Sequence, residues 1–86
     1  MKLRPEFITH RTGERQVMVS VGGSGFHGVV QSNKTAAEII DLLKQEVTRE
    51  QLIREMRRKY DAPEAVISDD VDQVLGTLRK IGALEE

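Results

Sequence analysis

The stretch from Val29 to Leu43 constrains the fold of this 86-residue chain more than any other part of it. It opens with β-branched residues, reaches Asn33, a residue suited to start a helix, and continues with apolar residues at helical spacing. The residues before it have strand patterns, and those after it have helix patterns. We therefore expect an α+β domain, a small sheet followed by helices, with this strand at the junction.

Three strands are expected before Asn33. Phe7–Arg11 is rich in β-branched and aromatic residues, and Gln16–Val21 alternates, with the valines at 17, 19 and 21 on one face. Gly13 supplies a tight turn between them. The third strand, Phe26–Gln31, follows a glycine-rich connection. These strands predict a three-stranded antiparallel sheet, half-buried on one face.

Three helices are expected after the sheet. Asn33 caps the first, whose apolar stripe is Ala36, Ile39, Ile40, Leu43 and Val47. Thr48 and Gln51 match a capping box, so the second helix starts there, and it stops before Pro63. Its apolar residues are Leu52, Ile53, Met56 and Tyr60.

Ser68 is the expected N-cap of the third helix. Asp69, Asp70 and Asp72 then fall in the first turn, where the helix dipole favours negative charge. Val71, Val74, Leu75 and Leu78 form its core stripe, and Gly82 ends it. The predicted order is therefore β-β-β-α-α-α, a sheet followed by a three-helix bundle.

Length and composition favour one domain over residues 1–86, with an ordered core from about 6 to 84. The chain has no Cys, no apolar run long enough to span a bilayer and no signal-peptide pattern, so a cytoplasmic location is expected. Residues 61–86 carry seven acidic and two basic side chains, which argues against a last helix that binds DNA.

Residues 23–28 spell G-x-G-x-x-G, but a further strand follows them instead of a helix, so a hairpin loop is the simpler interpretation. His10 and His27 have no evident third metal ligand. Asp69, Asp70 and Asp72 lack the glycine and distal Glu of a calcium loop. We therefore expect no catalytic residues, no metal site and no cofactor, and the chain is not predicted to be an enzyme.

A basic cluster late in the second helix consists of Arg54, Arg57, Arg58 and Lys59. A solvated face with cations near a helix C-terminus explains it, supported by a Glu50–Arg54 pair four residues apart. Binding of an acidic partner is the alternative interpretation.

Taken together, these patterns resemble the pyrroloquinoline quinone biosynthesis protein D (PqqD-like) family. The resemblance covers the chain from about Phe7 to Leu84, and its residues are Val29-Val30, Asn33, Ala36-Ala37, Ile39-Ile40, Leu42-Leu43, Thr48, Leu52-Ile53, Met56, Tyr60, Asp70-Val71, Val74-Leu75, Leu78 and Gly82. It implies a winged-helix-like RiPP recognition element. Such a domain is a non-catalytic chaperone that binds the leader of a ribosomally made precursor peptide and presents it to a modifying enzyme, often a radical SAM enzyme.

The resemblance also implies where the leader binds: as an extra strand beside the third strand and against the third helix. The strand side of that groove would be Phe26, His27, Gly28, Val29, Val30 and Gln31. The helix side would be Asp70, Gln73, Val74, Thr77, Lys80 and Ile81. Strand addition satisfies the open backbone groups of a sheet edge, which is the physical basis of this mode.

Two other functions stay open at this stage. One is a winged-helix nucleic-acid-binding protein that uses the basic cluster, which predicts affinity that falls steeply with salt. The other is a structural or dimerisation module in which the open edge pairs with its own copy. The expected oligomeric state is a monomer or a weak homodimer through that edge.

Overall fold

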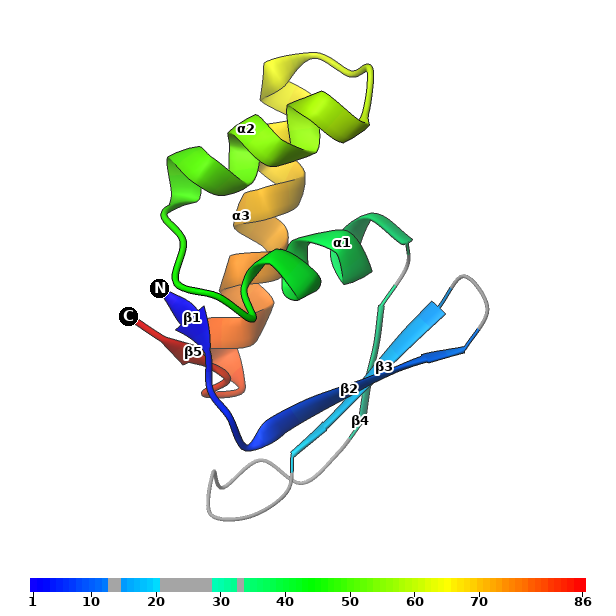
Figure 1. Ribbon diagram of the computed structural model, residues 1–86, viewed down its shortest axis with the longest axis vertical. Coiled ribbons are helices and arrows are strands. Elements are labelled where there is room, and N and C mark those ends of the chain that lie inside the picture. The colour runs from blue at the N-terminus through cyan, green and yellow to red at the C-terminus, as the bar shows by residue number, and fades with distance from the viewer. Residues whose placement is uncertain (13–14, 21–28, 33) are drawn as a thin grey trace.

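The computed structural model describes residues 1–12, 15–20, 29–32 and 34–86. The chain forms an α+β fold in which short antiparallel strands precede and follow three helices (Figure 1). In chain order the elements are β1 (Lys2–Leu3), β2 (Phe7–Thr12), β3 (Arg15–Ser20), β4 (Val29–Ser32), α1 (Lys34–Leu42), α2 (Arg49–Lys59), α3 (Glu64–Lys80) and β5 (Leu84–Glu85).

The three predicted strands correspond to β2, β3 and β4, which form an antiparallel sheet in that order. Met18 at the centre of β3 lies opposite Thr9 on one side and Val30 on the other. The predicted turn at Gly13, the glycine-rich connection and the helix cap at Asn33 lie outside the described residues.

One face of this sheet packs against α1. Met18 is fully buried and Gln16 is 2% exposed, whereas Val17 and Val19 are only half-buried. The alternation along β3 is therefore as predicted, and the buried face is the one that carries Met18 and Gln16. The more uniformly apolar face, with the valines, lies on the outside.

A second sheet pairs the two ends of the chain, and the sequence patterns do not predict it. Leu3 in β1 is opposite Leu84 in β5, and Figure 1 shows both termini together beside the last turn of α3. The backbone N–H of Leu3 also donates to the carbonyl of Leu43 at 2.8 Å. The predicted β-β-β-α-α-α order was therefore incomplete, because strands of two residues are too short to produce a readable alternation.

The predicted start of α2 is confirmed by its capping box. The Thr48 hydroxyl accepts from the Gln51 N–H at 3.2 Å, and the Gln51 side chain accepts from the Thr48 N–H at 2.8 Å. These two bonds satisfy N–H groups that the first turn of a helix leaves open. The helix ends at Lys59, before Pro63, as expected.

The predicted start of α3 was wrong. The helix begins at Glu64 with Pro63 at the N-cap, and the Ser68 hydroxyl donates to the carbonyl of Ala65 at 3.1 Å within the helix. Proline is well tolerated at a helix start, because its missing N–H would have no helical partner there. Asp69, Asp70 and Asp72 consequently lie beyond the first turn.

The end of α3 agrees with the prediction, since Gly82 has a positive φ of 72° that suits glycine. Helix α1 contacts α2, α3, β3 and β4 and so joins the sheet to the other helices. The core between them is mostly aliphatic, with Phe7 from β2, and its helical members are Ala37, Ile39, Ile40, Leu52, Met56, Ile67, Val71, Leu75 and Leu78.

Candidate functional site

Strand β4 is the terminal strand of its sheet. It pairs with β3 on one side, and no strand in the described part of the chain pairs with its other side. A terminal strand carries a row of backbone N–H and C=O groups that can pair with another chain. Of the predicted strand residues, Val29, Val30 and Gln31 lie in β4, and Phe26, His27 and Gly28 lie outside the described residues.

The predicted helix residues share one flank of α3. At 100° per residue, Asp70, Val74, Thr77 and Ile81 follow one stripe, with Gln73 and Lys80 beside it. Val74 and Ile81 pack against the core while staying partly exposed, and Thr77 is exposed. We call this stripe, together with Val66, the β4-side flank of α3.

Val66 was missed by the sequence reasoning. It lies one turn before Asp70 on the same flank, and its side chain is 49% exposed although it is apolar. It was overlooked because α3 was predicted to start at Ser68. Val66 therefore adds one exposed apolar side chain to the flank that carries the predicted helix residues.

A pocket of about 190 Å³ opens among the three helices. Its lining is mostly apolar and consists of Thr35, Ile39, Met56, Tyr60, Ala62, Ile67 and Asp70. Thr35 is in the first turn of α1, just after the end of β4, so the pocket lies where the strand leads into the helix. Asp70 is the one predicted site residue that lines it.

A polar cluster fastens the sheet to α1. The Gln16 side-chain amide donates to Asp41 Oδ1 at 2.9 Å, and Arg11 donates to Asp41 Oδ2 at 2.6 Å. Lys44 adds an ion pair to the same carboxylate at 3.2 Å. Burial alone would raise the pKa of Asp41, but these three donors outweigh it and hold the pKa below its ordinary value of 3.8.

This cluster also relates β4 to α1, because Gln16 is the register partner of Ser32 at the end of β4. The Gln16 Oε1 atom is buried and has no hydrogen-bond partner among the described residues. A buried acceptor without a hydrogen-bond partner lowers the stability of the fold, so a donor placed next to Gln16 Oε1 stabilises it.

The sequence of the chain matches the family model for coenzyme PQQ synthesis protein D (PqqD) over residues 15–84. The chain belongs to this family. No curated protein matches it. Among solved structures, TbiB1 in complex with the TbiA(beta) leader peptide is similar, with a TM-score of 0.83 and 15% sequence identity over 99% of this chain and 95% of that one. At that identity the similarity establishes a shared fold.

The basic cluster of this PqqD-family chain is largely ion-paired. Arg57 pairs with Glu64 at 3.4 Å, Arg58 with Glu55 at 3.1 Å, and Lys59 with Glu38 at 2.6 Å. The expected Glu50–Arg54 pair does not form. Across the described ranges, no carboxylate lies within 4.0 Å of Arg54. Packing of α2 against α3 and α1 brings Glu64 to Arg57 and Glu38 to Lys59, whereas Arg58 pairs within α2 itself.

The possible metal ligands do not converge in the part of the PqqD-family chain that the structure describes. No group of three or more His, Asp or Glu side chains there could hold a metal ion. His10 is exposed on β2, and His27 is outside the described residues. None of the described helices is long and apolar enough to cross a membrane.

Proposed function

We propose that this chain binds the leader of a ribosomally synthesised precursor peptide and presents it to a modifying enzyme, without catalysing a reaction itself. The observation that carries the proposal is the outer edge of β4, with which no described strand pairs, in a chain that belongs to the PqqD family. The similar structure of TbiB1 was solved with a leader peptide, which supports the same role for this fold.

In this proposal the leader adds to the sheet as a strand beside β4. Its backbone pairs with the outer N–H and C=O groups of Val29, Val30 and Gln31 and continues toward 26–28. The β4-side flank of α3 forms the opposite wall. The pocket beside Asp70 is large enough to accept an apolar side chain of the leader, which would add selectivity to the backbone pairing.

The expected affinity follows from the number of contacts. Each net hydrogen bond contributes about 1 kcal/mol, and a buried apolar side chain contributes about 1.5–3 kcal/mol. Ordering a disordered leader costs part of this gain. Several bonds and one anchor then correspond to micromolar binding, about −8 kcal/mol.

The finer description of the fold is part of the same proposal. We describe residues 1–86 as one winged-helix-like domain, in which α2 and α3 form the helical pair and β2–β3 the hairpin. The partner enzyme is proposed to be a peptide-modifying enzyme, such as a radical SAM enzyme, and the domain is proposed to act in the cytoplasm. A Cys-free chain needs no oxidising compartment to fold, which agrees with that location.

The test is a titration of the isotope-labelled chain with the leader of the precursor encoded beside its gene. We expect backbone amide shifts in β4 and along the β4-side flank of α3. Shifts confined to the outer strand β2 or to the β1–β5 pair would contradict the proposal.

Two proline variants sharpen this test. Neighbouring residues of a strand direct their N–H groups to opposite sides. One of the variants Val30→Pro and Gln31→Pro therefore removes an N–H that faces β3, and the other removes an N–H on the outer edge of β4. The variant that loses the outer N–H should stay folded and lose leader affinity by about tenfold, as expected for one lost hydrogen bond and local distortion. Unchanged affinity in a folded edge variant would rule out strand addition at β4.

A further inference from the structure

A groove of about 780 Å³ runs between α2 and α3, and the proposed leader site does not use it. Four arginines of α2 line it: Arg49, Arg54, Arg57 and Arg58. Glu50 and Glu64 are the acidic residues of the lining, so the groove carries two net positive charges on a chain whose net charge is −1. Positive charge therefore gathers in this groove, although the chain as a whole is slightly acidic.

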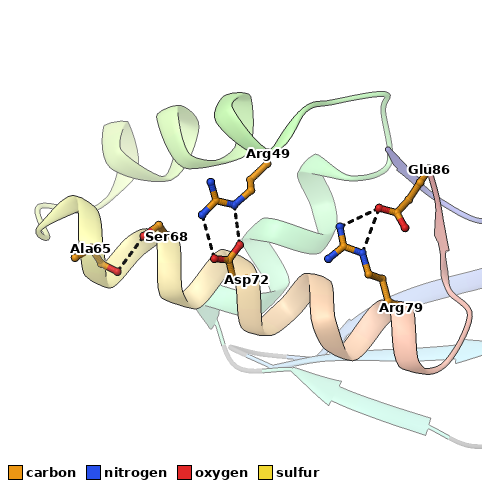
Figure 2. Close-up of polar contacts among 6 residues, drawn as sticks. All are labelled: Arg49, Ala65, Ser68, Asp72, Arg79 and Glu86. Atoms are coloured by element: carbon orange, nitrogen blue, oxygen red, sulfur yellow. Dashed lines mark hydrogen bonds and ion pairs between the residues drawn. The ribbon is translucent and has the colours of Figure 1, made fainter.

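Arg49 has a structural role in this groove. It donates to both carboxylate oxygens of Asp72, at 2.7 and 3.0 Å, and so ties the start of α2 to the middle of α3 (Figure 2). A two-pronged bond of this type is the strongest form of surface ion pair. Arg49 is accordingly part of the frame, and the other three arginines remain to contact a ligand.

Two of those three arginines, Arg57 and Arg58, can exchange their partners at little cost. Arg57 meets Glu64 at 3.4 Å, and both side chains are more than half exposed. Arg58 is 73% exposed in its pair with Glu55, which lies one turn away on the same helix. Exposed pairs of this kind contribute about 0–1 kcal/mol, so an incoming carboxylate can replace them. Arg54 has no ion-pair partner among the described residues.

The shape of the groove suits a helix. Its α3 wall includes Ala65 and Ser68, small side chains that allow close approach, and the half-buried Ile53 provides an apolar floor. From Arg49 to Arg58 the α2 wall of the groove extends for roughly 14 Å at 1.5 Å per residue. A helix of two to three turns therefore fits this length, with carboxylates toward the arginines and an apolar residue on Ile53.

The groove and the leader site lie on opposite flanks of α3. Ser68 lines the groove and Thr77 belongs to the β4-side flank, and these two positions are half a turn apart at 100° per residue. The buried residues Val71, Leu75 and Leu78 separate the two flanks. Both surfaces can consequently be occupied at the same time.

We propose that the α2–α3 groove docks an acidic amphipathic helix of a partner protein. If the proposed function holds, that partner is the enzyme that receives the leader, and the groove holds the enzyme while the opposite flank of α3 holds the peptide. A protein ligand fits better than nucleic acid, because a helix can place an apolar side chain on Ile53, whereas a phosphate backbone has none to place there.

The test titrates the labelled chain with a synthetic helical peptide that carries glutamates four residues apart on one face and leucines on the other. A control peptide has the same composition, with its glutamates spread around the helix. We expect the amides of Ile53, Arg57 and Ser68 to shift, and the one-faced peptide to bind about tenfold more tightly than the control. Equal binding of the two peptides, or tighter binding of a DNA duplex, would overturn the proposal.

Matched variants locate the binding. Arg54→Glu/Arg57→Glu should lower the affinity for the acidic peptide by about tenfold or more. Arg54→Glu alone is a second variant that breaks no ion pair and so keeps the fold. Arg4→Glu makes the same change of charge beside Ala83, past the far end of α3, and should leave the affinity within about twofold. An equal loss in Arg4→Glu would show that net charge alone is responsible.

A leader titration separates this inference from the proposed function. The leader should bind Arg54→Glu/Arg57→Glu as well as it binds the unmodified chain. If the leader binds but the acidic peptide does not, the groove proposal alone is wrong. If the acidic peptide binds but the leader does not, the proposed function alone is wrong.

Discussion

The two flanks of α3 have different chemistry although they belong to one continuous helix. The β4-side flank mixes exposed and half-buried residues, such as Val66, Val74 and Thr77, and makes no ion pair in the described structure. The opposite flank carries Asp72 and Arg79, which Figure 2 shows paired with residues outside α3. The β4-side flank is therefore open to a segment along its length. The opposite flank ties α3 to the rest of the fold at Asp72 and Arg79 and lines the α2–α3 groove at Ala65 and Ser68.

The difference shows how a domain of this size can offer two surfaces. A helix repeats every 3.6 residues, so a buried stripe leaves two flanks that face away from each other. In this chain the stripe of Val71, Leu75 and Leu78 is almost completely buried and serves both flanks. Each flank can therefore change its chemistry without disturbing the other, as long as the stripe is intact.

The largest effect is expected from a change in the buried stripe of α3, which supports both flanks. Leu75 is 1% exposed, and Leu75→Ala should lower the free energy of unfolding by about 2–5 kcal/mol and weaken both binding activities together. Urea denaturation measures the loss. Gly76→Ala is the matched control, because a Cβ there meets no atom within 4 Å and alanine favours the helix by about 0.5–1 kcal/mol. A loss below about 1 kcal/mol for Leu75→Ala would show that the stripe is not the shared support.

An intermediate effect should separate the flanks. Thr77→Arg places a large cation on the exposed β4-side flank and should weaken leader binding by about tenfold, with an unfolding free energy within about 0.5 kcal/mol of the original. Calorimetry with the leader and with the acidic peptide measures both activities. Thr77→Ser should bind both ligands normally. If Thr77→Arg weakens the binding of both ligands equally, the two flanks are coupled and do not act as separate surfaces.

The smallest effect concerns the polar cluster that fastens the sheet to α1. The pKa of Asp41 is lower in the folded chain than its ordinary 3.8, so its carboxylate adds stability above that pH and loses it as the pH falls through the folded pKa. The side chain is 36% exposed, so solvent screening limits the contribution to about 1 kcal/mol or less.

Asp41→Asn keeps an acceptor for Gln16 but removes the charge. Its unfolding free energy should be lower than that of the original chain at neutral pH, and the difference should shrink on acidification below 3.8. Denaturation across this pH range measures it. Asp69→Asn, an exposed site with no ion pair among the described residues, should show no such trend. If the difference in unfolding free energy stays constant as the pH falls, the charge of Asp41 does not contribute to stability.

Local sequence signals predicted much of the fold. The capping box at Thr48, the stop at Gly82 and the alternation along β3 are all present, because each depends on residues a few positions apart. The start of α3 was missed for a local reason too, since Ser68 is a better cap in isolation than Pro63. A proline that can open a helix outweighed it here.

By itself, the sequence determined the order of the main elements and the flank of α3 on which Asp70, Val74 and Thr77 fall, because helical and strand periods are properties of the backbone. Only the tertiary structure decided that Met18 and Gln16 form the buried face of β3, that Leu3 pairs with Leu84, and that α2 and α3 enclose an arginine-lined groove. These features join residues far apart in the chain. Their positions follow from how the elements pack against one another, and the periodicity within one helix or strand carries no information about that packing.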